Sequence, residues 1–423
     1  MTNFADKKVL IMGSFCNISG YSLHSRTLAD SLINMENGPE VFLIDLQWAE
    51  ATRSSAYISR YRERLTHTQQ FMKFLQSTNA KVNEVFDCSF QVRPPNEWQR
   101  VTNFDVGVTA ALETVAAPKE WVDNCNMMKK ILVVSSHAKK NLLNAVCDGR
   151  KITTPIDVVP FYNTMPENKE KFSGYNDVTT SKNFLCVSQL APRKNLHNMI
   201  AWFIEEFKDD PEAGLILKTY IKNNSVIDCQ MSKDAFHNFI STNFPEKKCK
   251  IYLLHGGLSD SEIETLYDKE TITGYISAAH GEGFGIPIFN AVCSGIPVIA
   301  PAWSGHLDFL NAPVKNETSG KVKTRNLFLK TSYEIEKVKE VHLMPGLITE
   351  DCKWCYPESK SFKKNLRSLF KSPRTHNMNA ELLKEHIIKT HSKDKVESLY
   401  QDAVKEIILG KAEGKENDET LYL

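Results

Sequence analysis

Residues 271–302 read TITGYISAAHGEGFGIPIFNAVCSGIPVIAPA. The apolar runs at the two ends of this segment have the length of buried strands. Between them, a glycine-rich turn leads into a predicted helix that begins at Pro287, because proline suits the first helical turn. A strand, a helix and a second strand are the repeating unit of a parallel sheet covered by helices on both faces.

The same order of elements recurs along the chain. In the N-terminal half, apolar runs predict strands at 8–12, 41–46 and 131–136, with a helix over 23–33. In the second half, strands are predicted at 183–187, 215–219 and 251–255. Ser259 and Glu262 then have the spacing of a helix capping box. The sequence therefore predicts an α/β fold of two Rossmann-like, doubly wound parallel-sheet domains.

The length of 423 residues exceeds that of a single hydrophobic core and predicts two domains. The stretch 160–182 is rich in Pro, Asn, Lys, Ser and Thr and lacks a sustained period, as expected of a linker. We expect one domain over 1–165 and another over 166–395. Residues 396–410 then predict an amphipathic helix that packs back on the first domain, and 411–423 a frayed tail.

Composition excludes several classes of protein. The 52 Lys and Arg residues balance 51 Asp and Glu residues, so the chain has no overall charge that would favour nucleic acid or an anionic membrane. No apolar run is long enough for a signal peptide or a membrane span, and most cysteines are isolated, so we expect a cytoplasmic protein. Cys352 and Cys355 form a C-x-x-C without a second pair of ligands, which favours packing over a metal or redox site.

The glycine turn after the strand at 271–279 has the features of an anion site. Gly281, Gly283 and Gly285 let the backbone approach a phosphate, and the helix that follows offers unpaired N–H groups. The alternative is a tight turn whose glycines only permit positive φ angles. Glu282 lies inside this turn, where it would repel phosphate unless it faced hydroxyl groups, and a sugar supplies hydroxyl groups.

Two further turns leave the same predicted sheet edge, where ligands of such sheets bind. SQLAPRKN (188–195) projects Arg193 and Lys194, which would neutralise a diphosphate as it leaves, although solvated surface charge is the alternative. PAWSGHLDFL (301–310) brings Ser304, His306 and Asp308 after the next strand. The three turns together predict a site for a sugar nucleotide.

These motifs resemble a known family. SQLAPRKN followed by GYISAAHGEGFGIPIFNAVCSGIPVIAPAWSGHLDFL (274–310) resembles the donor domain of family-4-like retaining glycosyltransferases, which have the GT-B fold of two Rossmann-like domains facing a cleft. VGVTAALETVAAPKEWVDNCNMMKKILVVSSHAKK (106–140) resembles their acceptor domain. The resemblance covers about residues 5–310 and is more specific in the second domain. It implies a hexosyl- or pentosyltransferase.

The resemblance implies roles for individual residues on the donor side. Glu282 would approach the transferred sugar, and Lys194 would bind phosphate with Arg193 beside it. The second glutamate of the family pattern falls on Asn290, which can bond a ribose hydroxyl but carries no charge. The remaining positions implied in donor binding are Gln189, His280, the backbone of Gly283, Phe284 and Gly285, and Gly20 of the first domain.

On the acceptor side, the candidates are His24, Glu113, His306 and Asp308. Family membership would mean front-face attack by an acceptor hydroxyl with retention at the anomeric carbon. The chain has no D-x-D pair, so neither a metal nor a cofactor beyond the nucleotide sugar is expected. The acceptor itself is open to a glycan, a small molecule or modified DNA.

Other functions are compatible with the same pattern. YISRYRERL (57–65) and KSFKKNLRSLFKSPR (360–374) interleave aromatic residues with cations, as nucleic-acid binders do, although charged helix faces look the same. The N-terminal half resembles phage-encoded members, so hydroxymethylated bases of phage DNA, in the host cytoplasm, are one candidate acceptor. A sugar-nucleotide 2-epimerase and a non-catalytic nucleotide-sugar binder are the alternatives. An NAD enzyme is disfavoured because G-x-G-x-x-G is missing.

Overall fold

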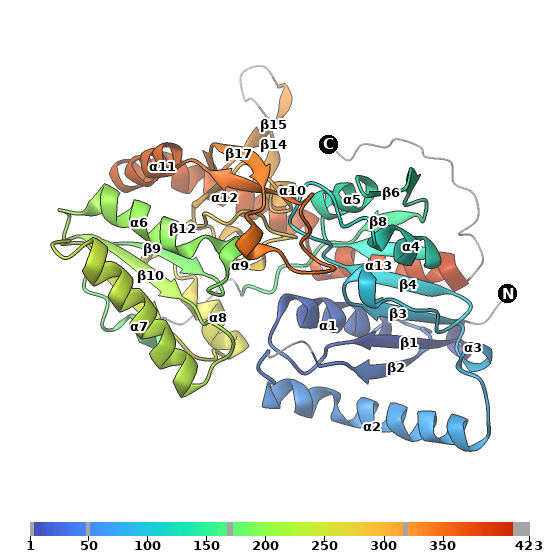
Figure 1. The fold of residues 1–423 in the computed structure, drawn as a ribbon. Helices are drawn as coiled ribbons and strands as arrows, with labels where there is room; N and C mark the ends of the chain where they lie inside the picture. Colours follow the sequence, from blue (N-terminus) through green and yellow to red (C-terminus); the bar gives the residue numbers. More distant parts are fainter. Residues whose placement is uncertain (1–3, 48–50, 167–171, 316–319, 409–423) are drawn as a thin grey trace. The chain divides into compact units, whose positions relative to one another are not determined.

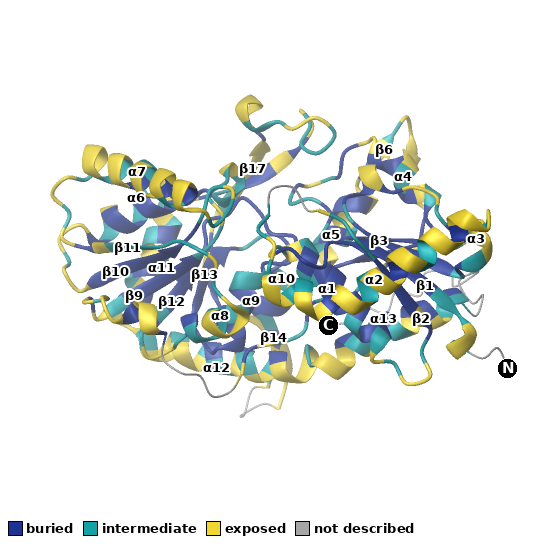
Figure 2. Ribbon diagram, turned by 90° about the horizontal axis from the view of Figure 1, so that it is seen from below, coloured by how far each residue is buried: buried dark blue, intermediate teal, exposed yellow. Residues whose placement is uncertain are grey.

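The computed structural model describes residues 4–47, 51–166, 172–315 and 320–408. Contacts divide the chain into two compact units, each with its own parallel sheet (Figure 1). Unit 1 contains the residues up to Tyr162, the segment Lys339–Cys352 and the segment that begins at His391. Unit 2 contains Asn163–Val338 and Lys353–Thr390. In both units the central strands of the main sheet are buried and the helices expose their outer faces (Figure 2).

Unit 1 is built on a six-stranded parallel sheet in the order β2-β1-β3-β4-β5-β8. Its strands are β1 (Lys8–Gly13), β2 (Glu40–Asp45), β3 (Cys88–Val92), β4 (Asp105–Thr109), β5 (Lys130–Val133) and β8 (Ile156–Val158). The chain runs from β1 to β2 on one side and then returns to place β3 on the other side of β1. The direction of winding therefore reverses between β1 and β3.

Helices cover this sheet on its two faces. They are α1 (Gly20–Ile33), α2 (Ser55–Ser77), α3 (Val82–Val85), α4 (Trp121–Met127), α5 (Ser136–Leu143) and α13 (Lys393–Ile408). Short elements complete the unit: η1 (Phe4–Asp6), η2 (Pro95–Glu97), η5 (Glu340–His342), and the pair β6 (Val146–Cys147) and β7 (Arg150–Lys151). Helix α13 packs on α1, and its Val396, Tyr400 and Val404 join the core beneath α1.

Unit 2 is built on a second six-stranded parallel sheet, in the order β11-β10-β9-β12-β13-β16. Its strands are β9 (Lys182–Val187), β10 (Ala213–Lys218), β11 (Lys250–Leu254), β12 (Ile272–Ile276), β13 (Val298–Pro301) and β16 (Leu329–Thr331). The winding reverses between β9 and β12. Apart from the half-exposed edge strand β11, the strands are largely buried, as expected of a parallel sheet covered on both faces.

The helices of unit 2 are α6 (Leu196–Phe207), α7 (Val226–Asn243), α8 (Asp260–Leu266), α9 (Ile286–Cys293), α10 (Leu307–Leu310), α11 (Ser359–Lys371) and α12 (Pro373–Thr390). The small elements are η3 (Ser173–Tyr175), η4 (Pro192–Lys194), β14 (Asn311–Lys315) paired with β15 (Val322–Asn326), and β17 (Tyr333–Lys337) paired with β18 (Lys353–Pro357). Helix α11 packs on α6, and α12 packs on α9. The capping box predicted at Ser259 and Glu262 is present at the start of α8.

The α/β fold with two doubly wound parallel sheets is confirmed, but the division of the chain differs in detail from the expected domains. The first unit ends at Tyr162 rather than at residue 165. The segment Lys339–Cys352, expected inside a continuous second domain, lies with unit 1 because Trp121 Nε1 donates to the Gly346 carbonyl (3.0 Å) and Leu347 packs beside it. The tail expected at 411–423 lies outside the described residues.

Within the described ranges, no helix combines the length and apolar character that a membrane-crossing helix needs.

Candidate functional site

The candidate site lies at the carboxyl ends of β9 and β12, the two neighbouring strands between which the second sheet reverses its winding. Connections on opposite faces of the sheet diverge at such a point, and ligands of open α/β sheets bind in the crevice that results. The turn after β9 carries Arg193 and Lys194, and the turn after β12 carries Glu282. Figure 1 places α9 directly after this second turn.

Two hydrogen bonds hold the turn after β9 against the turn after β12. The backbone N–H of His280 donates to the carbonyl of Arg193 (2.8 Å), and Asn195 Nδ2 donates to the carbonyl of Ala278 (3.0 Å). Asn195 has a φ of 55°, in the left-handed region that asparagine tolerates better than most residues. Asn195 was not among the predicted site residues, and its position after Pro-Arg-Lys, just before a helix, was the available signal.

The turn after β13 locks the backbone of Glu282. Its N–H donates to Ser304 Oγ (2.9 Å), and its carbonyl accepts the N–H of Gly305 (2.9 Å). A Cβ on Gly305 would lie 2.0 Å from the carbonyl oxygen of Gly283, so only glycine permits this approach. The three predicted turns therefore meet as expected.

The side chain of Glu282 is the centre of the site. Lys194 Nζ lies 2.7 and 2.8 Å from its two carboxylate oxygens, and Arg193 Nη1 lies 3.4 Å from Oε2. Arg193 Nη1 also donates to the carbonyl of Gly281 (2.5 Å). The exposed fraction is 11% for the Glu282 side chain and 17% for that of Lys194. These charges interact in a largely desolvated environment, where ion pairs are stronger than at the surface.

Two opposing effects set the pKa of Glu282. Burial alone would raise the pKa, but the charges of Lys194 and Arg193 and the hydrogen bond from Lys194 outweigh it and hold the pKa below its ordinary value. The carboxylate is therefore ionised at neutral pH. We expected the two cations to face a diphosphate while Glu282 faced a sugar; in the structure the three side chains pair with one another.

The two histidines beside these turns are buried and hydrogen-bonded. His280 Nδ1 lies 2.7 Å from the carbonyl of Cys355 in β18, and its ring stacks on Trp354 at a centroid distance of 5.3 Å. His306 Nε2 lies 2.8 Å from the carbonyl of Pro301. Burial lowers the pKa of His306, which keeps its ring neutral. Tyr356, 4.5 Å from the His280 ring, is a neighbour that the sequence did not indicate.

The other predicted donor residues have mixed positions. Gly285 has a φ of 94° and caps the N-terminus of α9, with Pro287 in the first turn, so the predicted turn and helix start are present. The side chain of Asn290, half-buried on α9, hydrogen-bonds the hydroxyl of Tyr267 inside the unit. Phe284 packs in the core against Phe289 and Phe309, at centroid distances of 5.1 and 4.9 Å.

Gln189 and Asp308, by contrast, lie in exposed positions of unit 2. Gln189 donates through Nε2 to the carbonyl of Ile221 (2.8 Å) in the loop after β10. Asp308 lies on the short helix α10.

Three of the remaining candidates belong to unit 1, whereas the acceptor-side candidates His306 and Asp308 lie in unit 2. Gly20 is exposed at the first position of α1, and Glu113 is half-buried in the turn after β4. His24 is 1% exposed and lies in the core, with its ring 5.4 Å from that of Phe161. Burial lowers the pKa of His24 to about 3, and its Nε2 has no hydrogen-bond partner. This core position does not support the expected contact with an acceptor.

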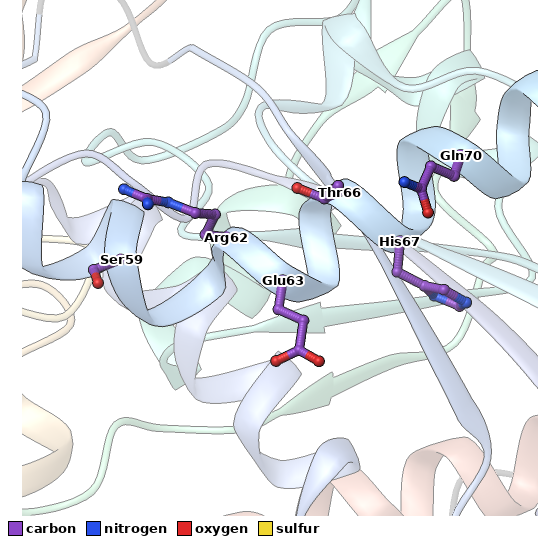
Figure 3. A pocket seen from close by; sticks show the side chains of 6 residues that line it. All are labelled: Ser59, Arg62, Glu63, Thr66, His67 and Gln70. Atoms are coloured by element: carbon purple, nitrogen blue, oxygen red, sulfur yellow. The ribbon is translucent and has the colours of Figure 1, made fainter.

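The aromatic and basic residues of 57–65 are largely engaged within unit 1. Arg60 pairs with Asp30 (2.7 Å), Tyr61 is buried, and Arg64 donates to the carbonyl of Val41 (3.1 Å). The guanidinium of Arg26 covers the ring of Tyr57 at 3.7 Å. Figure 3 shows a pocket on helix α2, which contains residues 57–65. Polar and charged side chains line it: Ser59, Arg62, Glu63, Thr66, His67 and Gln70.

The basic segment at 360–374 is similarly engaged. Lys363 pairs with Glu205 (2.7 Å), and Arg367 pairs with Glu206 (2.5 Å), both across the α6–α11 contact. Neither segment presents the row of exposed aromatic rings that stacking on single-stranded nucleic acid requires.

The cysteines do not form a chemical site among the described residues. All ten are free thiols, and burial raises the pKa of Cys355 above its ordinary value, which disfavours the reactive thiolate. Within the described ranges, no group of three or more His, Cys, Asp or Glu side chains is arranged so that it could hold a metal ion.

No protein-family model matches the sequence, and no curated protein matches it. Solved structures do match. Sucrose-phosphate synthase from Thermosynechococcus elongatus has a TM-score of 0.63 at 10% identity, covering 96% of this chain and 100% of that one. Anabaena HepE in complex with UDP and glucose has a TM-score of 0.61 at 14% identity, covering 94% and 99%.

A glycosyltransferase from Rickettsia africae has a TM-score of 0.57 at 15% identity and covers 95% of this chain and 99% of that one. At these identities the likeness establishes the architecture and not the activity. The two sheets, their strand orders and the near-complete coverage agree: this chain has the GT-B fold of two Rossmann-like domains.

Proposed function

We propose that this protein is a glycosyltransferase, which transfers a hexosyl or pentosyl group from a nucleotide sugar to an acceptor hydroxyl. The observation that carries the proposal is the buried Glu282 carboxylate held by Lys194 and Arg193 where the second sheet reverses its winding. A nucleotide sugar presents a diphosphate beside a sugar. Two cations and one carboxylate, fixed a few ångströms apart, match those two parts.

In this proposal, donor binding rearranges the cluster. The diphosphate competes with Glu282 for Lys194 and Arg193, because a phosphate oxygen is also a strong partner for these cations. Glu282 is then released to accept hydrogen bonds from hydroxyls of the sugar. As the bond to the sugar breaks, negative charge grows on the leaving diphosphate, and the two cations stabilise it.

The stereochemistry and donor are finer parts of the same proposal. The resemblance of residues 188–195 and 274–310 to retaining enzymes supports front-face attack with retention. Lys194 and Arg193 supply the charge that a diphosphate requires, so we infer transfer without a metal ion. The HepE structure was solved with UDP and glucose, which makes UDP-sugars the first donors to test.

The test is to incubate the purified protein with UDP-, GDP- and ADP-sugars and follow release of the nucleoside diphosphate, with and without acceptors. The acceptors should include glycans, small alcohols and DNA with hydroxymethylated bases. We expect Glu282→Ala to lower transfer about 100-fold or more. The exposed Glu270 provides the matched control, and Glu270→Ala should transfer at the normal rate.

The same reactions separate the alternatives. An epimerised nucleotide sugar formed without acceptor would identify a 2-epimerase. Binding of donor without turnover by any acceptor would identify a nucleotide-sugar binder. Full transfer by Glu282→Ala would rule out this site.

A further inference from the structure

The first sheet has its own reversal of winding, between β1 and β3, and Arg93 lies there. Arg93 directly follows β3, and its backbone N–H continues the ladder by donating to the carbonyl of Val108 in β4 (3.1 Å). By the rule that locates ligands of open α/β sheets, the carboxyl ends of β1 and β3 border a binding crevice. Arg93 is therefore the counterpart, in unit 1, of the cations beside Glu282.

The guanidinium of Arg93 is poorly satisfied. Nη1 donates a long hydrogen bond of 3.3 Å to the carbonyl of Glu97. Nε and Nη2 are shielded from solvent and have no hydrogen-bond partner, and Arg93 forms no ion pair with any residue that the structure describes. Burial lowers the pKa of Arg93, and the charge of Glu97 offsets this only in part. An arginine stays protonated even so, and two of its donor nitrogens have no hydrogen-bond partner among the described residues.

Further polar groups lie at the carboxyl end of β4, the strand that pairs with β3. Tyr21, in the first turn of α1, shares a hydrogen bond of 2.8 Å with Thr109 Oγ1 at the end of β4. Burial raises the pKa of Tyr21, and the charges of Glu113 and Glu97 raise it further, so both carboxylates lie within electrostatic range of its hydroxyl. Glu97 acts on Arg93 as well, through its charge and through the carbonyl that accepts the hydrogen bond from Arg93 Nη1.

The backbone beside this cluster is strained. Ala111 has a φ of 53°, in the left-handed region that residues with a Cβ rarely adopt, and its N–H donates to Thr109 Oγ1 (3.1 Å). Strain of this kind concentrates at binding sites, where the surrounding structure maintains it.

A shielded charge with unsatisfied donors destabilises a fold, so a partner from outside the chain is the simplest compensation. The guanidinium presents its N–H groups in a planar fork that matches carboxylate and phosphate oxygens. The residue as a whole is partly exposed. The one hydrogen bond of the guanidinium, from Nη1 to the carbonyl of Glu97, is long and exposed, so it holds the side chain only weakly.

We propose that Arg93 binds an anionic group, a phosphate or a carboxylate, on the acceptor. This inference rests on the proposed glycosyl transfer, because it assigns unit 1 the acceptor. Glu97 and Glu113 are then placed to accept hydrogen bonds from acceptor hydroxyls, while Arg93 fixes the charged end. The acceptor class is thereby narrowed to anionic hydroxyl compounds.

The test follows the side-chain Nε–H signals of the arginines in the full chain by NMR, during titrations with inorganic phosphate and, separately, acetate at constant ionic strength. Arg93→Gln identifies the Arg93 signal by its loss. We expect the Arg93 signal to shift at an anion concentration at least about tenfold lower than that of the exposed Arg100 does. A stronger response to phosphate assigns a phosphorylated acceptor, and a stronger response to acetate a carboxylated one.

An Arg93 signal that moves no more readily than the Arg100 signal overturns the inference. The Arg193 signal, read in the same titration, reports the donor site, so failure of the two proposals is distinguishable. Melting temperature is a second measurement. Arg93→Gln should melt at or above the temperature of the unaltered protein, because it removes an unpaired charge; a lower melting temperature would mean that Arg93 is structural and would also overturn the inference.

Discussion

Both sheets have cations beside the point where the winding reverses, but the partners of these cations differ. In unit 2, Lys194 and Arg193 face a buried carboxylate within 2.7 and 3.4 Å. In unit 1, Arg93 has no ion-pair partner within the described part of the chain, and two of its nitrogens lack a hydrogen-bond partner. Both positions follow a central strand at the reversal of winding.

The sheet topology, which the two units share, and the residues of the turns, which differ, determine different properties of these sites. The topology brings loops to one edge and opens a crevice there, whichever residues they carry. The charge balance is a property of the turns. In unit 2 the two cations share one carboxylate, so a ligand there must displace an existing ion pair. Unit 1 has an unmatched charge, so a ligand there supplies the missing partner.

The largest expected effect comes from breaking the pair in unit 2. Lys194→Met should lower the free energy of unfolding by about 3 kcal/mol, because it leaves the Glu282 carboxylate buried with only the longer contact to Arg193. Urea denaturation measures this change. Adding Glu282→Gln to Lys194→Met should recover most of the loss, since the buried charge is then removed.

Arg93→Gln is the matched control in unit 1, and the comparison predicts no loss of stability. Equal losses for Lys194→Met and Arg93→Gln would contradict the distinction between the paired and the unpaired cation.

The buried histidines extend the comparison to pH. His306 has the Pro301 carbonyl as a partner, whereas His24 has no partner at Nε2 and has its pKa lowered from 6.5 to about 3. The unfolded chain therefore binds a proton at His24 below pH 6.5, and the folded chain only near pH 3. The contribution of neutral His24 to the free energy of unfolding is complete above pH 6.5 and is lost as the pH falls. At pH 5 this loss is about 2 kcal/mol.

His24→Leu should remove that part of the pH dependence without lowering stability at pH 7. Denaturation curves of the two proteins between pH 5 and pH 8 test this. Parallel pH profiles would show that His24 is not the titrating group.

The sequence predicted the fold well because the strand, turn and helix pattern is local. The turn after β12, the helix start at Pro287 and the cations at 193 and 194 were all located by position along the chain. The pairing of Lys194 with Glu282 was not predicted, because it depends on which side chains meet across 88 residues of the chain. His24 was misjudged for a related reason, since its place near a helix start gave no sign of the α13 residues that cover it.

Arg93 was not predicted at all. Its significance is the absence of a partner, and a sequence does not record which donors are left unsatisfied. The segment Lys339–Cys352 was expected in the second domain but groups with unit 1. The reason is of the same kind, because its contact with Trp121 joins residues 225 positions apart.

A smaller effect separates ligand binding from turnover in unit 2. Glu282→Gln should bind UDP about tenfold more tightly than the unaltered protein, because the diphosphate then no longer competes with a carboxylate for Lys194 and Arg193. Calorimetric titration with UDP measures the change. Weaker binding by Glu282→Gln would mean that the carboxylate orients the cations for phosphate instead of competing for them.

The smallest expected effect concerns Asn290, where the family pattern has a second glutamate. Its side chain bonds the buried hydroxyl of Tyr267, so Asn290→Ala should lower the free energy of unfolding by about 1 kcal/mol and change UDP affinity by less than about threefold. Tyr267→Phe should lower the free energy of unfolding by a similar amount. The double variant should lose little more, because both changes remove the same hydrogen bond. The opposite pattern is that Asn290→Ala weakens UDP binding about tenfold while Tyr267→Phe does not. That result would identify Asn290 as a ligand of the ribose. The two outcomes decide whether the site discriminates donors through the ribose or through the charge pair at Glu282.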